Sequence, residues 1–406
     1  MNIGQVIVAF LVLASSTRAP LAARQQTAAP VPIPFELENH LVIVNARVNN
    51  SGPLAFIFDT GASAAIVRTE TARNLGLSLQ GKVNGRGAGA GVQVGSLVKN
   101  ATWSLIGLER VSQPVAIALP LLALPSSLGR RIDGIIGGDF IGQFVVEVDY
   151  ESRRIRVHDR KTFGYQGPGA TLPIEFTSNG HPLIRASVTA QNHPPIAGRF
   201  LLDLGSSLAL ALHSPFVAEQ HLAGPESTMI RSIGGAGVGG RTTGHLGRVA
   251  ALQVGSFTIR NPVTLFSEDK AGAFADASTT GNIGAQIAER FRMFLDYAGR
   301  RVILEPLSTL AAPFDRAFSG VVLRAEDPDF HTFRVDDVLD PSPASEAGLT
   351  QGDIITAIDS RPAETMTLST LNELLQKPDT RELTIRLAMP GPRRCRPLPA
   401  WPTWTG

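Results

Sequence analysis

The sequence predicts a mainly β protein built from two homologous β lobes in one chain, followed by a smaller third domain. Composition, turn spacing and an internal repeat support this prediction. The 406 residues include 40 glycines and 28 prolines but only 6% aromatic residues, a balance typical of many short strands joined by turns. Hydrophobic residues make up 43% of the chain, which is enough to bury a sizeable core and excludes a mostly disordered protein.

The repeat divides the long β region into two copies. The sequence FIFDTGASAAIV around Asp59 recurs as FLLDLGSSLALAL around Asp203, 144 positions later. Two further pairs keep this register within three residues, each pair 147 positions apart: Gly137 with Gly284, and Asp149 with Asp296. Agreement at three separate places is hard to obtain by chance. We therefore predict one lobe over residues 35–165 and a second lobe over residues 166–306.

The first residues are typical of a targeting segment rather than of a folded element. Residues 3–13 form an apolar run with the length of a signal-peptide core, too short to span a bilayer, and Leu-Ala-Ala at residues 21–23 offers a cleavage site. We expect a signal peptide over residues 1–23, a Pro/Ala-rich linker over residues 24–34, and a periplasmic or secreted protein. No Lys or Arg precedes Arg18, so an uncleaved segment that anchors the protein in a membrane remains an alternative.

Charge and motif content exclude several classes of function. The 37 Lys and Arg residues against 35 Asp and Glu residues leave a formal net charge of +2, too balanced for a dedicated nucleic-acid-binding protein. The single cysteine, Cys395, excludes an intramolecular disulfide framework and a multi-cysteine metal site. The eight histidines show no metal-ligand spacing, and no G-x-S-x-G nucleophile turn occurs. We therefore expect no metal and no cofactor.

The repeated motif is specific enough to suggest a family. Two or three apolar residues, then Asp-Thr-Gly-Ala-Ser, a Gly-rich turn, and Ile-Ile-Gly-Gly-Asp resemble one lobe of an aspartic protease. The Gly-rich turns at residues 85–91 and 234–240 resemble the flaps of retropepsin-like enzymes, whereas the duplication in one chain resembles the pepsin-like arrangement. The resemblance covers residues 35–306. It implies an aspartic-type endopeptidase, a hydrolase of polypeptides, with Asp59 and Asp203 as its catalytic pair.

The chemistry explains why two such acids must meet. Two carboxyl groups about 3 Å apart cannot both ionise cheaply, so they share one proton. The ionised partner takes a proton from water while the protonated partner donates one to the substrate carbonyl. A lone Asp-Thr-Gly is usually only a turn, but two copies in register favour this catalytic interpretation.

The neighbours of each acid are expected to support it. Gly61 and Gly205 allow backbone N–H groups to approach the carboxylates. Ser63 and Ser207, each four residues after its Asp, are candidates to hydrogen-bond and orient the acids.

One departure from the family pattern keeps a second hypothesis open. The resemblance implies that Thr60 forms one half of a reciprocal hydrogen-bond lock beneath the pair. The second lobe has Leu204 at the matching position, and leucine has no hydroxyl to complete the lock. The alternative is a non-catalytic scaffold that binds extended peptides on the same fold.

Glycines in the two predicted flaps allow the backbone to approach an extended ligand and to open and close. The flap candidates are Gly87, Gly89, Gly235 and Gly237; ordinary flexible hairpins are the alternative. The spacing of Gly235, Gly237 and Gly240 also fits a dinucleotide-binding motif, but Arg-Thr-Thr-Gly follows it instead of a helix, so we reject that interpretation.

The third domain is expected over residues 314–389. Ser-Pro-Ala at residues 342–344, Ala-Gly-Leu at 347–349 and Gly-Asp at 352–353 resemble a bacterial-type PDZ domain. In that family a chain end adds as a strand between a β-strand and a helix, and backbone N–H groups hold its carboxylate. The residues assigned to this site by the resemblance are Ser319, Gly320, Val321, Val322 and Leu368.

The PDZ resemblance implies that C-terminal peptide tails are ligands of the domain. A packing module without a ligand is the alternative. The Pro-rich residues 390–406 are expected to be disordered.

Overall fold

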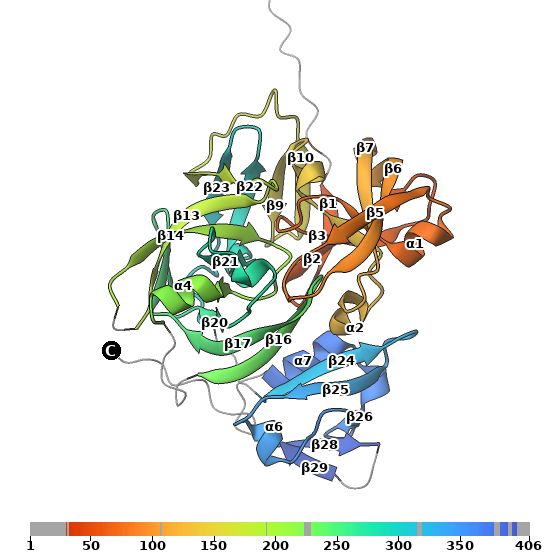
Figure 1. Cartoon of the computed structure of the whole chain (residues 1–406), viewed down its shortest axis with the longest axis vertical. Helices are drawn as coiled ribbons and strands as arrows, with labels where there is room; N and C mark the ends of the chain where they lie inside the picture. The colour runs from red at the N-terminus through yellow and green to blue at the C-terminus, as the bar shows by residue number, and fades with distance from the viewer. Residues whose placement is uncertain are drawn as a thin grey trace, which may run out of the picture.

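The computed structural model describes residues 30, 32–105, 108–191, 193–222, 229–314, 319–376, 382–388 and 392–395. Figure 1 shows two β lobes beside each other and a smaller domain packed against both. The protein is mainly β, as predicted, and the longest helix of the described residues, α7 (Leu368–Gln376), has nine residues. The signal segment expected over residues 1–23 lies outside the described residues. None of the helices in the described part of the chain combines the length and apolar character needed to cross a bilayer.

The described residues of lobe 1 form three short helices and ten strands. The helices are α1 (Thr69–Asn74), α2 (Leu124–Leu128) and α3 (Gly138–Ile141). The strands are β1 (Ile33–Glu38), β2 (Leu41–Val48), β3 (Leu54–Phe58), β4 (Ile66–Arg68), β5 (Leu79–Gly85), β6 (Gln93–Leu105), β7 (Leu108–Leu119), β8 (Gly134–Ile136), β9 (Val145–Asp149) and β10 (Arg154–His158).

Lobe 2 is likewise built from short helices and strands. Its helices are α4 (Ser214–Glu219), α5 (Ala285–Ala288) and the 3-10 turn η2 (Ala273–Ala275). Its strands are β11 (Ala170–Pro173), β12 (Glu175–Phe176), β13 (Pro182–Thr189), β14 (Ile196–Asp203), β15 (Leu210–Leu212), β16 (Ile230–Gly237), β17 (Gly240–Arg248), β18 (Ala251–Val254), β19 (Phe257–Arg260), β20 (Val263–Ser267), β21 (Gly281–Gly284), β22 (Phe291–Asp296) and β23 (Arg301–Pro306).

The sequence repeat corresponds to a repeat in strand pairing. In lobe 1, β3 runs parallel to β8, which pairs antiparallel with β4, and β4 runs parallel to β7. In lobe 2, β14 runs parallel to β21, which pairs antiparallel with β15, and β15 runs parallel to β20. Each repeated aspartate therefore lies at the end of the first strand of the same four-strand motif.

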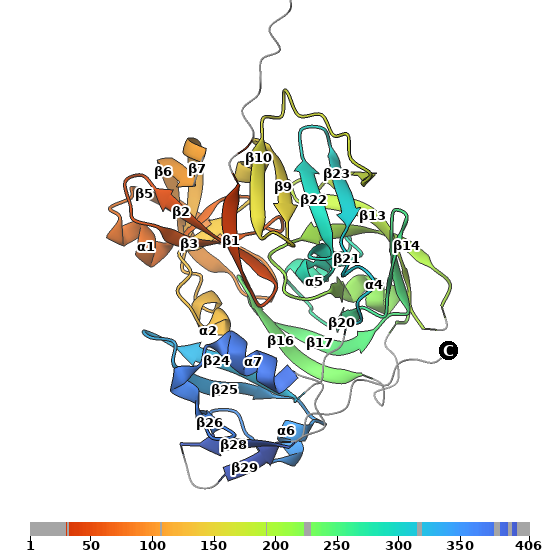
Figure 2. The same ribbon diagram turned by 180° about the vertical axis from the view of Figure 1, so that it is seen from behind.

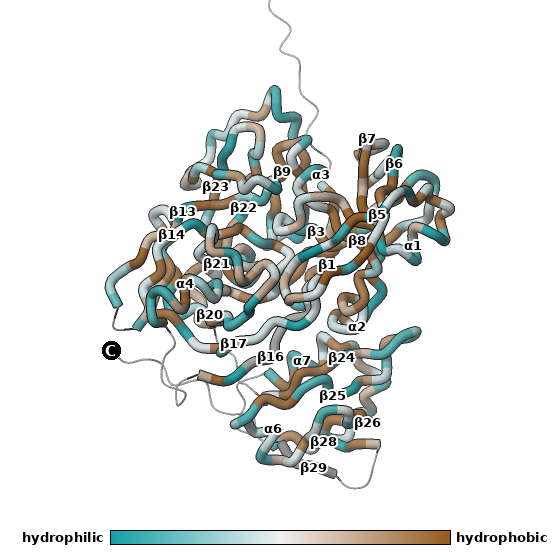
Figure 3. Tube along the Cα trace, viewed as in Figure 1, coloured by the Kyte–Doolittle hydropathy of each residue, from teal (hydrophilic) through white to brown (hydrophobic). Residues whose placement is uncertain are grey.

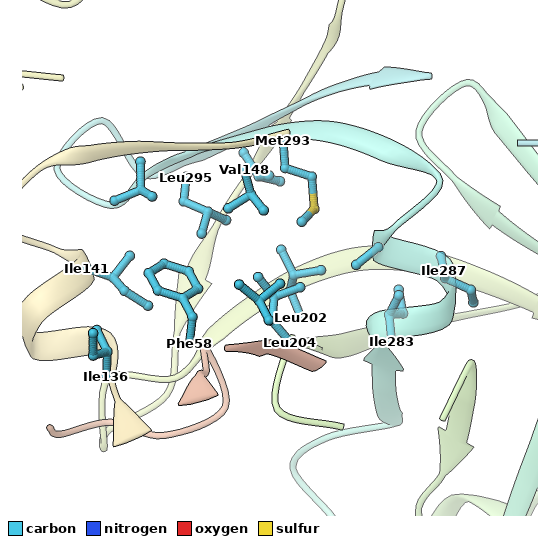
Figure 4. Packing of buried hydrophobic residues seen from close by; sticks show 14 of the residues in the cluster. Phe58, Ile136, Ile141, Val148, Leu202, Leu204, Ile283, Ile287, Met293 and Leu295 are labelled. Carbon is cyan, nitrogen blue, oxygen red and sulfur yellow. The ribbon is translucent and has the colours of Figure 1, made fainter. Parts of the chain in front are cut away.

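The two lobes share one sheet and one core. Strands β11, β23 and β22 of lobe 2 continue into β9, β10 and β1 of lobe 1, and β22 pairs antiparallel with β9 at the junction. Figure 2 shows β1, β10, β9, β22 and β23 side by side at the back of the molecule. One apolar cluster spans both lobes, and Figure 4 shows Phe58 from lobe 1 beside Leu202 and Leu204 from lobe 2. This joint core holds the ends of the two aspartate-bearing strands together.

The boundary of lobe 1 differs from the prediction by two residues. Ile33 and Pro34, expected in the linker over residues 24–34, belong to β1 and pair with Ile155 and Arg154 of β10. The physical reason is burial, because Ile33 is only 2% exposed and packs in the joint core.

The boundary between lobe 2 and the third domain also differs. Phe314, expected to begin the PDZ domain, packs in the core of the lobes. The Arg290 guanidinium donates hydrogen bonds to the carbonyls of Thr309, Leu310, Ala312 and Pro313 and lies 3.6 Å from the centre of the Phe314 ring. The connector is therefore bound to lobe 2, and lobe 2 ends at Phe314 rather than at Pro306.

The third domain has its own apolar core. Its strands are β24 (Val321–Glu326), β25 (Thr332–Val338), β26 (Ile354–Ile358), β27 (Arg361–Pro362), β28 (Leu383–Leu387) and β29 (Pro392–Cys395), and its helices are α6 (Pro343–Glu346), the 3-10 turn η3 (Ala363–Thr365) and α7. Figure 3 shows hydrophobic residues along its inner strands and hydrophilic residues in its outer turns.

One prediction for the C-terminal tail is wrong over four residues. The tail was expected to be disordered from residue 390, but residues 392–395 form β29 and pair with β28. Backbone hydrogen bonds to a sheet edge need no apolar side chains, so a Pro/Arg-rich composition did not reveal this strand.

Candidate active site

The structure brings the two repeated aspartates together at the interface between the lobes. Asp59 follows β3 and Asp203 ends β14. Their carboxyl groups lie side by side, because a Cβ atom placed on Gly61 would lie 2.4 Å from Asp203 Oδ1 and 3.1 Å from Asp59 Oδ1. The Gly61 N–H donates to Asp59 Oδ1 at 2.6 Å, and the Gly205 N–H donates to Asp203 Oδ1 at 3.1 Å.

Glycine is required after each acid because the opposite carboxyl occupies the space of a side chain. A Cβ atom on Gly61 would overlap the Asp203 carboxyl, and a Cβ on Gly205 would overlap the Asp59 carboxyl. The two glycines thus permit the close approach of the two acids, in addition to supplying N–H donors.

Burial and mutual repulsion set the ionisation of the pair. Burial, followed by the charge of Asp203, raises the pKa of Asp59 to about 8. Burial also raises the pKa of Asp203, but hydrogen bonds from Asn282 and the Gly205 N–H partly offset it. The pair titrates as one unit and keeps a shared proton to higher pH than an ordinary carboxyl group, because the pKa values of both acids are raised.

Thr60 forms the lock beneath the pair from one side. Its hydroxyl donates to the Leu202 carbonyl at 2.5 Å and accepts a hydrogen bond from the Leu204 N–H at 3.0 Å. Leu204 is fully buried in the joint core. Lobe 1 therefore holds lobe 2 through hydrogen bonds, whereas Leu204 contributes apolar packing.

The two predicted serines do not hydrogen-bond their acids through their side chains in the described structure. Ser63 is exposed, and its carbonyl accepts from the Asp139 N–H at 3.1 Å. The Ser207 carbonyl accepts from the Gln286 side chain at 2.7 Å. The expectation about the hydroxyl groups is therefore corrected: both serines contribute main-chain carbonyls that tie the turn after each acid to α3 or α5.

Sequence reasoning missed a polar chain behind Asp203. Asn282 Nδ2 donates to Asp203 Oδ2 at 2.7 Å, and Asn282 Oδ1 lies 2.9 Å from His213 Nε2. Both side chains are 3% exposed. A signal was available, because the 147-residue offset aligns Asn282 with Ile135, so a polar residue interrupts a strand that is apolar in lobe 1.

The two Gly-rich turns meet each other. The tip between β5 and β6 contacts the tip of the β16–β17 hairpin: the Gly239 N–H donates to the Ala88 carbonyl at 2.8 Å and the Gly91 N–H donates to the Gly239 carbonyl at 2.7 Å. A Cβ atom added to Gly89 would lie 2.6 Å from Gly239. A Cβ atom added to Gly237 would lie 2.6 Å from Ala88. Gly87 faces Val238, and Gly235 lies at a register shift within β16.

Each tip packs on the opposite lobe. Ala88 of lobe 1 packs against a lobe 2 cluster that includes Ala211, Leu265 and Phe274. Val238 of lobe 2 packs against a lobe 1 cluster that includes Leu119 and Ile135. The tips therefore bridge the lobes in a closed arrangement.

The predicted PDZ groove residues lie at one edge of the third domain. Ser319 is buried, its hydroxyl accepts from the Val321 N–H at 3.3 Å, and Gly320 has a φ of +79°. Val321 and Val322 are half-buried at the start of β24, and Leu368 is buried at the start of α7.

Helix α2 of lobe 1 lies against this same edge. It contacts β24, and a Cβ on Gly129 would overlap the Leu368 side chain. Figures 1 and 2 both place α2 next to β24 and α7. A second contact joins Arg241 of the β16–β17 hairpin to Asp336 of β25 at 2.5 Å. The third domain is therefore docked on both lobes.

Two homologous lobes with paired acids at strand ends define an aspartic-protease architecture. Residues 44–140 match the family model for an aspartyl protease, and residues 334–388 match the model for a PDZ domain. The chain thus carries an aspartyl protease domain and a C-terminal PDZ domain, as its resemblances indicated.

The crystal structure of basic 7S globulin from soybean is similar to this chain, with a TM-score of 0.43 and 12% sequence identity over 69% of this chain and 96% of that one. No curated protein matches the sequence.

Proposed function

We propose that this protein is an exported aspartic endopeptidase that hydrolyses peptide bonds through Asp59, Asp203 and an activated water. The observation that carries this proposal is the close contact of the two carboxyl groups at the lobe interface, where a Cβ atom on Gly61 or Gly205 would overlap the opposite acid. Two acids with raised pKa values that share a proton supply both a base and an acid near neutral pH.

In the proposed first step the two acids have different roles. Asp203, which accepts a hydrogen bond from Asn282, carries the negative charge and takes a proton from water. Asp59 donates its proton to the oxygen of the scissile carbonyl. Collapse of the resulting tetrahedral species breaks the C–N bond and returns a proton through the pair to the leaving amine.

The flap tips account for substrate enclosure. An extended peptide would enter between the tips and the acids, which requires the tip-to-tip hydrogen bonds to open. The apolar clusters beneath Ala88 and Val238 would then be free to contact side chains of the substrate.

The PDZ domain is proposed to bind the C-terminal tails of polypeptides. The buried Ser319 and the positive φ of Gly320 fit a turn that presents N–H groups to a carboxylate. Because α2 contacts β24 and Leu368, a tail must displace α2 or bind beside it. Export is proposed from the apolar run at residues 3–13.

The second candidate function is a scaffold that binds peptides without cleaving them. Leu204 favours it, because this apolar residue stands where a threonine would complete the hydrogen-bond lock. The deciding experiment is cleavage of an unfolded protein between about pH 3 and 8, with and without pepstatin, a statine-type inhibitor. Inhibitor-sensitive cleavage supports the endopeptidase. Binding of the unfolded chain without any cleavage across the pH range would support the scaffold.

A further inference from the structure

We propose that Asn282 and His213 are positioning residues that hold the negative charge of the carboxyl pair on Asp203. This inference rests on the proposed function, because it assigns the base of the reaction to lobe 2. It concerns a buried hydrogen-bonded chain that runs from Asp203 through Asn282 to His213.

Asn282 is placed by strand pairing. It lies on β21 directly opposite Leu201 of β14, two residues before Asp203. Its side chain is almost completely buried, and its amide nitrogen is 2.7 Å from Asp203 Oδ2. A buried amide that donates to a carboxylate stabilises the ionised form of the acid.

His213 determines which way the amide faces. It follows β15, and its Nε2 is 2.9 Å from Asn282 Oδ1, whereas its Nδ1 is 3.3 Å from the Asp276 carbonyl. The shorter contact places a hydrogen on Nε2, because Oδ1 can only accept. With Oδ1 held by His213, the amide N–H₂ group points toward Asp203.

The charged groups around His213 do not replace this role. Asp276 and Asp269 are the acids that act on the ring electrostatically, and both favour its protonated form. Burial outweighs them and lowers the pKa of His213. The ring therefore remains neutral near neutral pH and acts as a fixed donor.

The described residues of lobe 1 form no such chain behind Asp59. Ile135 occupies the position that matches Asn282 and is a buried apolar residue. Within the described residues, the side chain that acts on the ionisation of Asp59 is that of Asp203 itself. A symmetric pair would place the proton on either acid, whereas the Asn282–His213 chain removes this symmetry.

The first test is the pH profile of peptide cleavage by the full chain carrying Asn282→Leu, which preserves the branched shape and removes the donor. We expect kcat to fall roughly ten- to a hundredfold, the scale of a lost hydrogen bond to a charged group. The acid limb of the profile should move to higher pH, because Asp203 loses the bond that favours its ionisation. Ile135→Leu is the matched control in lobe 1 and should leave that limb unchanged.

Two variants of His213 provide a second test, and we expect them to disturb folding less than Asn282→Leu does. Glutamine can present an N–H near the position of Nε2 but does not titrate, so His213→Gln should retain activity within about threefold. His213→Leu should lower kcat about tenfold with little change in KM, because the amide of Asn282 loses its orientation. Equal activity of these two variants, or an unmoved acid limb in Asn282→Leu, would overturn the proposal.

A measurement without catalysis separates this inference from the proposed function. Carboxyl ¹³C NMR of the Asp-labelled protein, assigned with Asp203→Asn, reports the titration of the pair even if no substrate is cut. We expect Asn282→Leu to raise the apparent pKa of the step assigned to Asp203. An unchanged titration would refute the positioning role, whereas a shifted titration in a protein that never cleaves would refute only the endopeptidase.

Discussion

The two lobes present their acids on the same four-strand motif but restrain them by different means. In lobe 1, Thr60 extends hydrogen bonds across the interface to Leu202 and Leu204. In lobe 2, Leu204 is apolar, and the restraint on the acid comes from Asn282 behind it. The same strand pairing and a joint core therefore bring the two acids together, while the residues that surround each acid differ between the lobes.

The turns after the acids show the same divergence. Asp139 Oδ1 accepts a hydrogen bond from the Ala65 N–H at 2.8 Å in lobe 1, whereas the Gln286 amide donates to the Ser207 carbonyl at 2.7 Å in lobe 2. The first side chain acts as an acceptor and the second as a donor. Duplicated turns can therefore be held in one shape by contacts of opposite polarity.

The largest expected effect removes the pair itself. Asp59→Asn and Asp203→Asn should each lower kcat by about a thousandfold or more, because each leaves half of a proton-sharing unit. The measurement is cleavage of a peptide by purified variants with unchanged circular dichroism. Near-wild-type turnover in either variant would show that the lobes do not act as one site.

The lock provides a direct contrast between the lobes. Thr60→Val should lower the free energy of unfolding by about 2 kcal/mol, because two buried backbone groups lose their partner, and should reduce kcat/KM. Leu204→Thr should also cost about 2 kcal/mol through lost apolar burial, yet preserve or raise activity. Denaturant unfolding and steady-state kinetics give both quantities. A collapse of activity in Leu204→Thr would mean that apolar packing, rather than the lock, supports the site.

The pH dependence of stability follows from the raised pKa values of the pair. An acid whose pKa is raised on folding stabilises the protein fully below its ordinary value and loses this contribution as pH rises through the folded value. For Asp59 that window runs from its ordinary 3.8 to about 8. Asp59→Asn should therefore flatten the decline of Tm across this window and raise Tm by a few degrees at pH 7. A steeper decline than wild type would contradict the buried-pair interpretation.

The flap tips allow a smaller, paired test. Gly89 has a φ of +89°, and a Cβ there would lie 2.6 Å from the Gly239 backbone. Gly89→Ala should lower kcat/KM roughly tenfold, which corresponds to about 1.4 kcal/mol of strain at the closed tips. At Gly87 the nearest atom to a new Cβ is Val238 Cβ at 3.2 Å, so Gly87→Ala should stay within about threefold. Equal losses of kcat/KM in Gly89→Ala and Gly87→Ala would show that catalysis does not require contact between the two flap tips.

The smallest effect on chemistry is expected from removing the PDZ domain. A chain that ends after Phe314 keeps both acids and both tips and should cleave short peptides normally. It should lose efficiency on substrates with a free C-terminal tail, because tethering raises the effective concentration of the cleavable segment. A chain that ends after Pro306 is the contrast, since it loses the contacts to Arg290 and the buried Phe314 ring. Its Tm should be lower by several degrees, and equal Tm values would show that the connector is not part of lobe 2.

Much of the architecture was predictable because it depends on local patterns. Apolar runs before Asp59 and Asp203 predicted the strand ends, and the repeat predicted two lobes. The sequence predicted that Gly61 and Gly205 let backbone N–H groups approach the acids, but it did not predict that they also make room for the opposite carboxyl group. Their overlap with the opposite acid depends on how the lobes face each other, and local sequence carries no information about that.

The sequence by itself determined the two repeated β units, the pair of acids and the character of the third domain, because these depend on periodicity and motif spacing within short segments. Only the tertiary structure placed Asn282 against an acid 79 positions away, bound the connector to Arg290, and set α2 against the PDZ domain. These features depend on contacts between segments far apart in the chain. A hydrogen bond or a buried contact forms only where folding brings its partners within a few ångströms, and composition does not specify which distant segment will arrive there.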